Sequence, residues 1–183
     1  TPYGGPVSPP VLADWREGTT AVFDSMAAFA EATVNLSGSG EAERIHAWRV
    51  TPQFWSVMDL PAQAGRYFGA DEDAAGERVV VLGHALWQRR YGADPAIVGT
   101  DIVINNEAHR VVGVTPPAFR YPSADVAYLP TYLAAATPDR GSNYLSVLAR
   151  LRPGIGLDQA DAALAQVNAR LAADYPDNNA GIG

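Results

Sequence analysis

The chain has no cysteine, only three histidines and fewer basic than acidic residues. The lack of cysteine excludes disulfides, thiolate zinc sites and a cysteine nucleophile. The 13 lysines and arginines are scattered and stand against 20 aspartates and glutamates, which gives a formal net charge of -7. Such a surface repels a phosphate backbone, so we predict no nucleic-acid partner.

Long apolar runs are missing as well. None approaches the ~20 residues that a membrane-spanning helix needs. The first residues, TPYGGPVSPP, lack the basic and then apolar order of a signal peptide. At 183 residues the chain is long enough to bury one good core or two small cores that share an interface. Both ends are typical of cut points in a longer protein, so we interpret the sequence as an excised soluble domain.

His84 is the most plausible catalytic residue, because it follows the apolar run VVVL and a glycine. However, the sequence contains no Gly-x-Ser-x-Gly nucleophile motif and no His-x-x-x-His pair. His46, His84 and His109 fall in three separate segments, so a zinc site has no support from spacing. We interpret His84 as a structural residue at the start of a helix, and we predict no catalytic residue, no metal site and no cofactor.

Two other motifs have a simpler interpretation than a binding site. Asp71, Glu72, Asp73 and Glu77 form an acidic cluster, but they lack the spacing of a calcium loop, so we expect a solvated acidic loop. The glycines of the same stretch are not followed by Gly-Lys-Ser/Thr, which excludes a phosphate loop. The tryptophans are widely spread and are expected to fill cores; they are Trp15, Trp48, Trp55 and Trp87.

The first half of the chain mixes helix and strand patterns. Prolines predict a helix that starts near residue 9 and ends at Gly18. We expect a helical turn at 23–27, then a strand to Leu36 and a returning strand over 44–50. Thr51 and Pro52 open another helix, and residues 59–77 are expected to be mostly loop.

The second half continues the mixture without regular strand–helix alternation. Residues 79–82 predict a buried strand, and 85–91 a short helix with Trp87 and Tyr91 on one face. Asn105 and Asn106 predict the turn of a β-hairpin over 100–114. Strands are expected over 125–133 and 145–151, and an amphipathic helix over 157–175. This order predicts the α+β class.

The order of several segments resembles a known family. These segments are VTPQFWSVMDLPAQAGRYF, ERVVVLGHALWQRRYGADPAIVGTDIVINNEAHRVVGVTPPAFRYP, DVAYLPTYL and LARLRPGIGLDQADAALAQVNARLAADYPDNN. From about Val7 to its end the chain resembles the periplasmic core domain of MacB-like ABC transporter permeases. The residues of these segments are most similar to those of predicted permeases of the acidobacterial type, which carry two such domains.

The resemblance implies an architecture and a place. A porter-like α/β sandwich subdomain is expected over residues 1–58 and 139–183, with a smaller inserted α+β lobe over 59–138. The domain is expected at the extracytoplasmic (periplasmic) face of the bacterial cytoplasmic membrane, anchored by flanking transmembrane helices that this sequence lacks. Because such flanks leave and re-enter the bilayer together, residues near Val11 and Tyr175 are expected to be neighbours.

The resemblance also implies a role, which is non-catalytic. The full-length permease pairs with a cytoplasmic ABC ATPase, and the domain couples ATPase-driven motion to export or to envelope processes. A periplasmic adaptor or a second copy of the domain is the further partner expected. A periplasmic ligand- or protein-binding module remains as the alternative, which would need a cleft with convergent polar groups.

Overall fold

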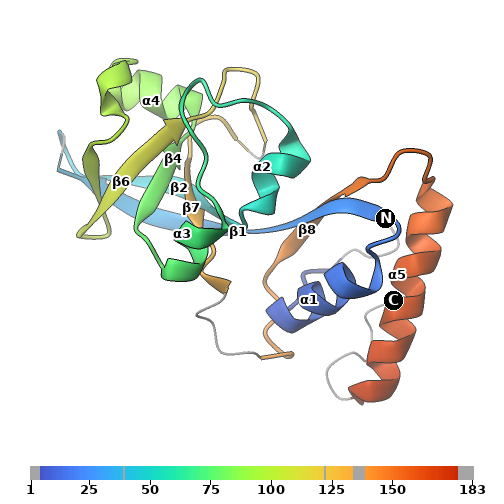
Figure 1. The fold of residues 1–183 in the computed structure, drawn as a ribbon. Helices are drawn as coiled ribbons and strands as arrows, with labels where there is room; N and C mark the ends of the chain where they lie inside the picture. Colours follow the sequence, from blue (N-terminus) through green and yellow to red (C-terminus); the bar gives the residue numbers. More distant parts are fainter. Residues whose placement is uncertain (1–4, 39, 122, 134–138, 177–183) are drawn as a thin grey trace. The chain divides into compact units, whose positions relative to one another are not determined.

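The computed structural model describes residues 5–38, 40–121, 123–133 and 139–176. By their contacts, these residues divide into two compact units. The first unit combines residues 1–28 with 137–183, and the second comprises residues 29–136. Both units contain helices and strands, so the expected α+β class is confirmed (Figure 1).

The first unit consists of two helices and two strand segments. Helix α1 (Pro9–Gly18) begins with two prolines, whose fixed φ suits the first helical turn. Strand β1 (Phe23–Ser37) starts here, and β8 (Ser146–Leu151) pairs with it. Helix α5 (Leu157–Asp174) begins with a capping box in which Gln159 accepts a hydrogen bond from the backbone N–H of Gly156.

Helices α1 and α5 are joined by two polar contacts. The indole Nε1 of Trp15 donates to Oδ1 of Asn168 over 2.7 Å in a buried position. Arg140, which belongs to neither helix, donates to Asp14 in the middle of α1 over 2.8 Å, and its guanidinium lies 3.7 Å from the ring centre of Tyr175, just after α5. Arg140 therefore brings α1 next to the residue that follows α5, in agreement with the expectation that these two segments are neighbours.

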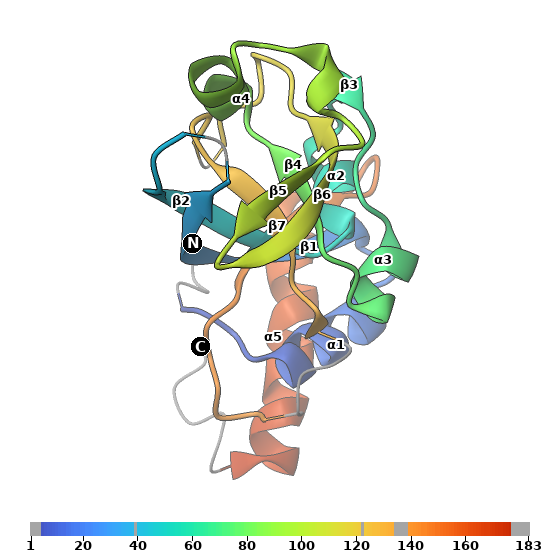
Figure 2. The ribbon, with the colours of Figure 1, turned by 90° about the vertical axis from the view of Figure 1, so that its left-hand side faces the viewer.

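The second unit is a closed barrel of six strands (Figure 2). Strand β1 pairs with β2 (Glu43–Val50) on one side and with β5 (Asp101–Ile104) on the other. Between them the ring continues through β7 (Ala127–Pro130), β4 (Val79–Leu82) and β6 (Glu107–Val114). The short strand β3 (Ala64–Gly65) adds to β6 outside this ring. Closure leaves no free edge in the ring, which restricts its deformation.

Apolar side chains fill the inside of the barrel. All six strands contribute, and helix α4 (His84–Tyr91) adds Leu86 and Trp87 to the same cluster. The register between β4 and β6 shifts between Val80 and Val81, because β6 has one extra residue there. This β-bulge changes the direction of the side chains that follow it. The strand residues of the cluster are Val34, Leu36, Ile45, Ala47, Val80, Leu82, Ile102, Ile104, Val111, Val114, Ala127 and Leu129.

A second, aromatic core surrounds α2 (Gln53–Met58). Phe54 and Trp55 point from this helix into a group of rings that includes Phe68, Phe119 and Tyr128. The ring of Trp55 also stacks on Tyr67, with 4.2 Å between centroids and 2° between planes. Desolvation raises the pKa of the Tyr67 hydroxyl to about 12, and it also raises the pKa of Tyr128.

These pKa shifts predict alkaline destabilisation. Below pH 10 tyrosine is neutral in both states, but between pH 10 and about 12 the unfolded state releases a proton that folded Tyr67 retains. The folded state therefore loses stability as the pH rises through this window. Urea midpoints should fall between pH 10 and 12, and Tyr67→Phe should reduce that fall. An unchanged pH dependence in Tyr67→Phe would show that this hydroxyl titrates normally.

The structure corrects two expected elements. Residues 23–27 are not a helical turn, because β1 is a strand from Phe23 onward. Met26, Ala27 and Ala28 are buried there, so packing outweighs the helical preference of the alanines. The stretch 59–77 contains β3 and helix α3 (Ala70–Ala75), so it is less irregular than expected.

The boundaries of the two compact units lie after residues 28 and 136. Residues 29–50 belong to the second unit because β1 and β2 are needed to close its barrel. The second unit therefore contains the longer share of the chain.

Candidate functional site

The three histidines lie apart and have structural surroundings. His84 begins α4, where its backbone N–H donates to Thr115 over 3.1 Å and its ring lies beside Trp87. His46 is exposed on β2 and lies 3.2 Å from Glu31, whereas His109 is buried on β6. Among the described residues, no group of histidine, aspartate and glutamate side chains could hold a metal ion.

The acidic cluster is a capped helix and not a solvated loop. Glu72 accepts hydrogen bonds from Arg66 at 2.7 and 2.8 Å and from the N–H of Gly69 at 2.9 Å. The hydrogen bond from Arg66 is the main cause that lowers the pKa of Glu72. Asp73 accepts from the backbone N–H of Tyr132 over 2.7 Å. These carboxylates therefore hold α3 in place.

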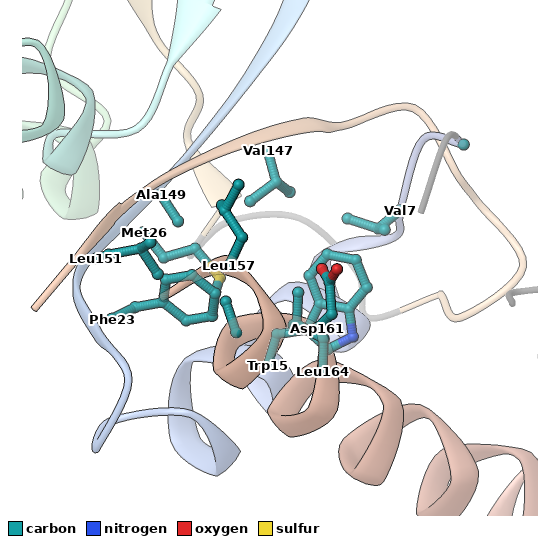
Figure 3. A pocket seen from close by; sticks show the side chains of 12 residues that line it. Val7, Trp15, Phe23, Met26, Val147, Ala149, Leu151, Leu157, Asp161 and Leu164 are labelled. Carbon is teal, nitrogen blue, oxygen red and sulfur yellow. The ribbon is translucent and has the colours of Figure 1, made fainter. Parts of the chain in front are cut away.

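An apolar groove in the first unit is the candidate binding site. It encloses about 290 Å³ between the β1–β8 strand pair on one side and helices α1 and α5 on the other (Figure 3). The segment that contains Val7 closes one end. The lining residues are Gly5, Val7, Trp15, Phe23, Met26, Val147, Ala149, Leu151, Leu157, Ala160, Asp161 and Leu164.

The two walls of the groove are incompletely covered. β8 contributes Val147, Ala149 and Leu151, which alternate along the strand and therefore share one face. None of the three is buried, and Leu157 on the α5 side is 73% exposed. Among the described residues of the lining, Asp161 is the one with a charged side chain (Figure 3). The rest of the described lining is almost entirely apolar.

Little in the sequence predicts this groove. Its residues come from five separate parts of the chain, which the pairing of β8 with β1 and the contact between α1 and α5 bring together. One signal was present: Leu157 and Leu164 belong to the apolar stripe predicted for α5, yet Leu157 is exposed. An apolar stripe that extends past its covered part indicates a surface available for contact.

Two further recesses are explained by the structural contacts around them. One lies beside Arg16 and Arg152 in the first unit, but Arg16 already donates to Met26 O and Arg152 to Thr20 O. The other is a broad hollow in the second unit near Trp55 and Tyr67. The rings of the aromatic core form the bottom of this hollow, so the packing of that core explains why these residues are there.

The buried hydrogen bond from Trp15 to Asn168 should stabilise the wall of the groove. Trp15→Phe removes the donor and leaves the Asn168 carbonyl without this partner, so we expect a loss of about 1–3 kcal/mol of unfolding free energy. The double variant Trp15→Phe/Asn168→Leu removes both partners and should lose less than the two single changes added together. Urea denaturation of the four proteins measures this coupling, and strict additivity would contradict it.

Comparisons with known proteins agree on the family and the fold. A family model described as the MacB-like periplasmic core domain matches residues 1–167. Among curated proteins, none matches the chain in sequence. No helix in the described part of the chain has the length and apolar character needed to cross a membrane.

Three solved structures have a similar fold. The periplasmic region of MacB from Actinobacillus actinomycetemcomitans is 14% identical with a TM-score of 0.72, over 96% of this chain and 77% of that one. The extracellular domain of the noncanonic ABC-type transporter YknZ from Gram-positive bacteria is 16% identical, with a TM-score of 0.69 over 92% and 84%. A domain of a putative permease protein from Porphyromonas gingivalis is 16% identical, with a TM-score of 0.64 over 91% and 71%.

Proposed function

Since the chain belongs to the family of MacB-like periplasmic core domains, we propose that it transmits ATPase-driven motion to export or to envelope processes. The family forms the part of an ABC transporter permease that lies outside the cytoplasmic membrane, and such permeases work with cytoplasmic ABC ATPases. In this proposal the domain performs no chemistry. It moves as the permease moves.

The closed barrel of the second unit is the structural observation that best supports a mechanical role. Every strand in the ring has two neighbours, so no strand can slide without breaking hydrogen bonds on both sides. Ion pairs also connect parts of this unit, since Arg89 on α4 contacts both Glu43 and Asp125. A unit built in this way transmits displacement instead of absorbing it. We propose that residues 1–58 and 139–183 form the porter-like subdomain next to the membrane, with residues 59–138 as its inserted lobe.

The proposal is tested in the full-length permease with its ATPase in lipid nanodiscs. The domain has no cysteine, so Gln88→Cys, exposed on α4, provides a specific spin-label position in the second unit. We expect the distance from this label to a second one on the membrane-spanning part to change between the nucleotide-free and ATP-bound states. A matched pair within the second unit, Gln88→Cys with Ala108→Cys on the exposed side of β6, should keep one distance in both states. If the first distance is also constant, the domain does not follow the ATPase cycle.

A ligand- or protein-binding module is the second candidate, and the apolar groove favours it. The groove combines incompletely covered apolar walls with one carboxylate, as a binding recess requires. The two roles are compatible, because a domain that moves needs a contact through which its motion reaches another molecule.

A further inference from the structure

The chain passes between the two compact units twice, and the two passages differ in their backbone. One passage lies within β1, which remains a strand across the boundary after residue 28. The other passage follows β7, because the second unit ends at residue 136. The end of β7 is therefore the place where the second passage is attached to the barrel.

Strand pairing alone holds this end on one side only. β2 pairs with β7 as far as Pro130, whereas the pairing with β4 ends at Tyr128. A strand end with one neighbour opens more easily than a strand held on both sides. If displacement of the chain is to reach the barrel here, the residues after β7 need a further attachment.

Tyr132, two residues after β7, has an unusual backbone conformation. Its φ of 55° lies in the left-handed region, which is unfavourable for a bulky residue. Such a conformation persists only where the surrounding contacts determine it, and residues of this kind gather at functional and switching segments. The contacts of Tyr132 therefore show what holds the chain at this point.

One carboxylate oxygen holds both residues that follow β7. Oδ1 of Asp73 on α3 accepts a hydrogen bond from the backbone N–H of Tyr132 over 2.7 Å and another from the Thr131 hydroxyl over 3.3 Å. A bond from an N–H to a carboxylate is stronger than one between neutral groups. Since the bonds of Glu72 fix the start of α3, Asp73 is a fixed point of attachment.

The side chain of Tyr132 provides a second attachment. Its hydroxyl donates to Glu77 O over 3.0 Å, just before β4 begins. Arg49 on β2 lies over its ring, with 5.7 Å between the guanidinium carbon and the ring centre, and donates to Pro130 O over 3.3 Å. The segment after β7 is thus attached to α3, to the residues before β4 and to β2.

We propose that Asp73 and Tyr132 form a clamp that fixes the direction in which the chain leaves the barrel, so that displacement reaches the barrel without opening the end of β7. Asp73 is a positioning residue in this sense, because it acts through the backbone of Tyr132. Without its carboxylate, Tyr132 loses the main support of its left-handed backbone and returns to a negative φ. This inference rests on the proposed mechanical function and names a residue on which that function depends.

Amide hydrogen exchange tests the clamp in the chain itself. In Asp73→Ala the N–H of Tyr132 loses its acceptor and should exchange at least about tenfold faster. Asp73→Asn keeps an oxygen acceptor without the charge, so its rate should fall between those of Asp73→Ala and the wild type. Asp71→Ala removes an exposed carboxylate from the same helix and is the matched control, with an unchanged rate. Val80, fully buried in β4, should stay protected in every variant, which shows that the barrel remains folded.

The role of the clamp in transmission is tested in the full-length permease with its ATPase. The distance from the Gln88→Cys label to the membrane-spanning part is measured in the nucleotide-free and ATP-bound states. In Asp73→Ala the change in this distance should be at least about twofold smaller than in the wild type, because displacement then reaches the barrel through β1 alone. Asp71→Ala should keep the full change. A residue that only stabilises the fold would shift the urea midpoint and leave this change as it is.

Three results would contradict these expectations in different ways. An unchanged exchange rate of the Tyr132 N–H in Asp73→Ala would overturn the clamp, because other contacts would then hold the left-handed backbone. Equal distance changes in Asp73→Ala and the wild type would overturn the role of the clamp in transmission, although the proposed function would stand. A constant distance in the wild type would contradict the proposed function itself, and the inference would fall with it.

Discussion

Replacing Trp87 with alanine is expected to lower the free energy of unfolding of the second unit by about 3–5 kcal/mol. The side chain is 7% exposed and belongs to the barrel core, although it comes from helix α4. Its Nε1 also donates to Asp94 O over 2.9 Å, which fixes the turn after the helix. The substitution therefore removes a large buried ring and a hydrogen bond, and it leaves a cavity at one end of the barrel.

Urea denaturation measures this loss. Gln88→Ala is the matched control, because Gln88 is the next residue on the same helix and is exposed. We expect its effect to stay within about 0.5 kcal/mol. Trp87→Phe should fall between the two, since it retains an aromatic ring but not the hydrogen bond to Asp94. An unchanged midpoint in Trp87→Ala would show that the ring is not part of the core.

Gly113→Ala is expected to destabilise the pairing of β3 with β6 by about 3 kcal/mol. A Cβ added at Gly113 would lie 2.1 Å from the carbonyl oxygen of Arg66 and 2.9 Å from its carbon. These are backbone atoms, so they cannot move aside as a flexible side chain would. The strands must separate, which also disturbs the hydrogen bond from Arg66 N–H to Val112 O.

Gly69→Ala is the control for this prediction. Gly69 lies in the same region of the chain, but an added Cβ there meets no atom within 4 Å, and its φ of -106° suits any residue. We expect a change of less than about 1 kcal/mol, because alanine is a weaker N-cap than glycine. Denaturation midpoints of the two variants should differ clearly. Equal midpoints would show that β3 can shift without cost.

Local patterns were sufficient for much of the fold. The prolines that begin α1, the glycine after α4 and the paired asparagines of the hairpin act within a few residues, and the structure has each feature where it was predicted. Asn105 and Asn106 have φ values of 51° and 66°, as their turn requires. Such signals depend on backbone sterics, which the sequence carries directly.

Long-range pairing was not predictable in the same way. β1 was expected to begin near residue 28, but its partners β8, β2 and β5 all lie further along the chain and impose an extended backbone from Phe23. Barrel closure depends on the same pairings. The groove is a consequence of tertiary pairing too, and no single stretch of sequence contains it. Only the family resemblance, which spans most of the chain, indicated how segments far apart in the sequence are arranged.

The discontinuity of the first unit has a consequence for biosynthesis. Residues 29–136 are contiguous, so the barrel has all of its strands once β7 has been synthesised. The first unit must wait for α5, because Asn168 and Val167 supply its contacts to Trp15 and Gly18. Since chains emerge from their N-terminus, α1 is made first but completes its packing last. Until then its apolar residues Val11, Leu12 and Trp15 lack part of their cover, which makes this helix the segment most exposed to chaperones and proteases during synthesis.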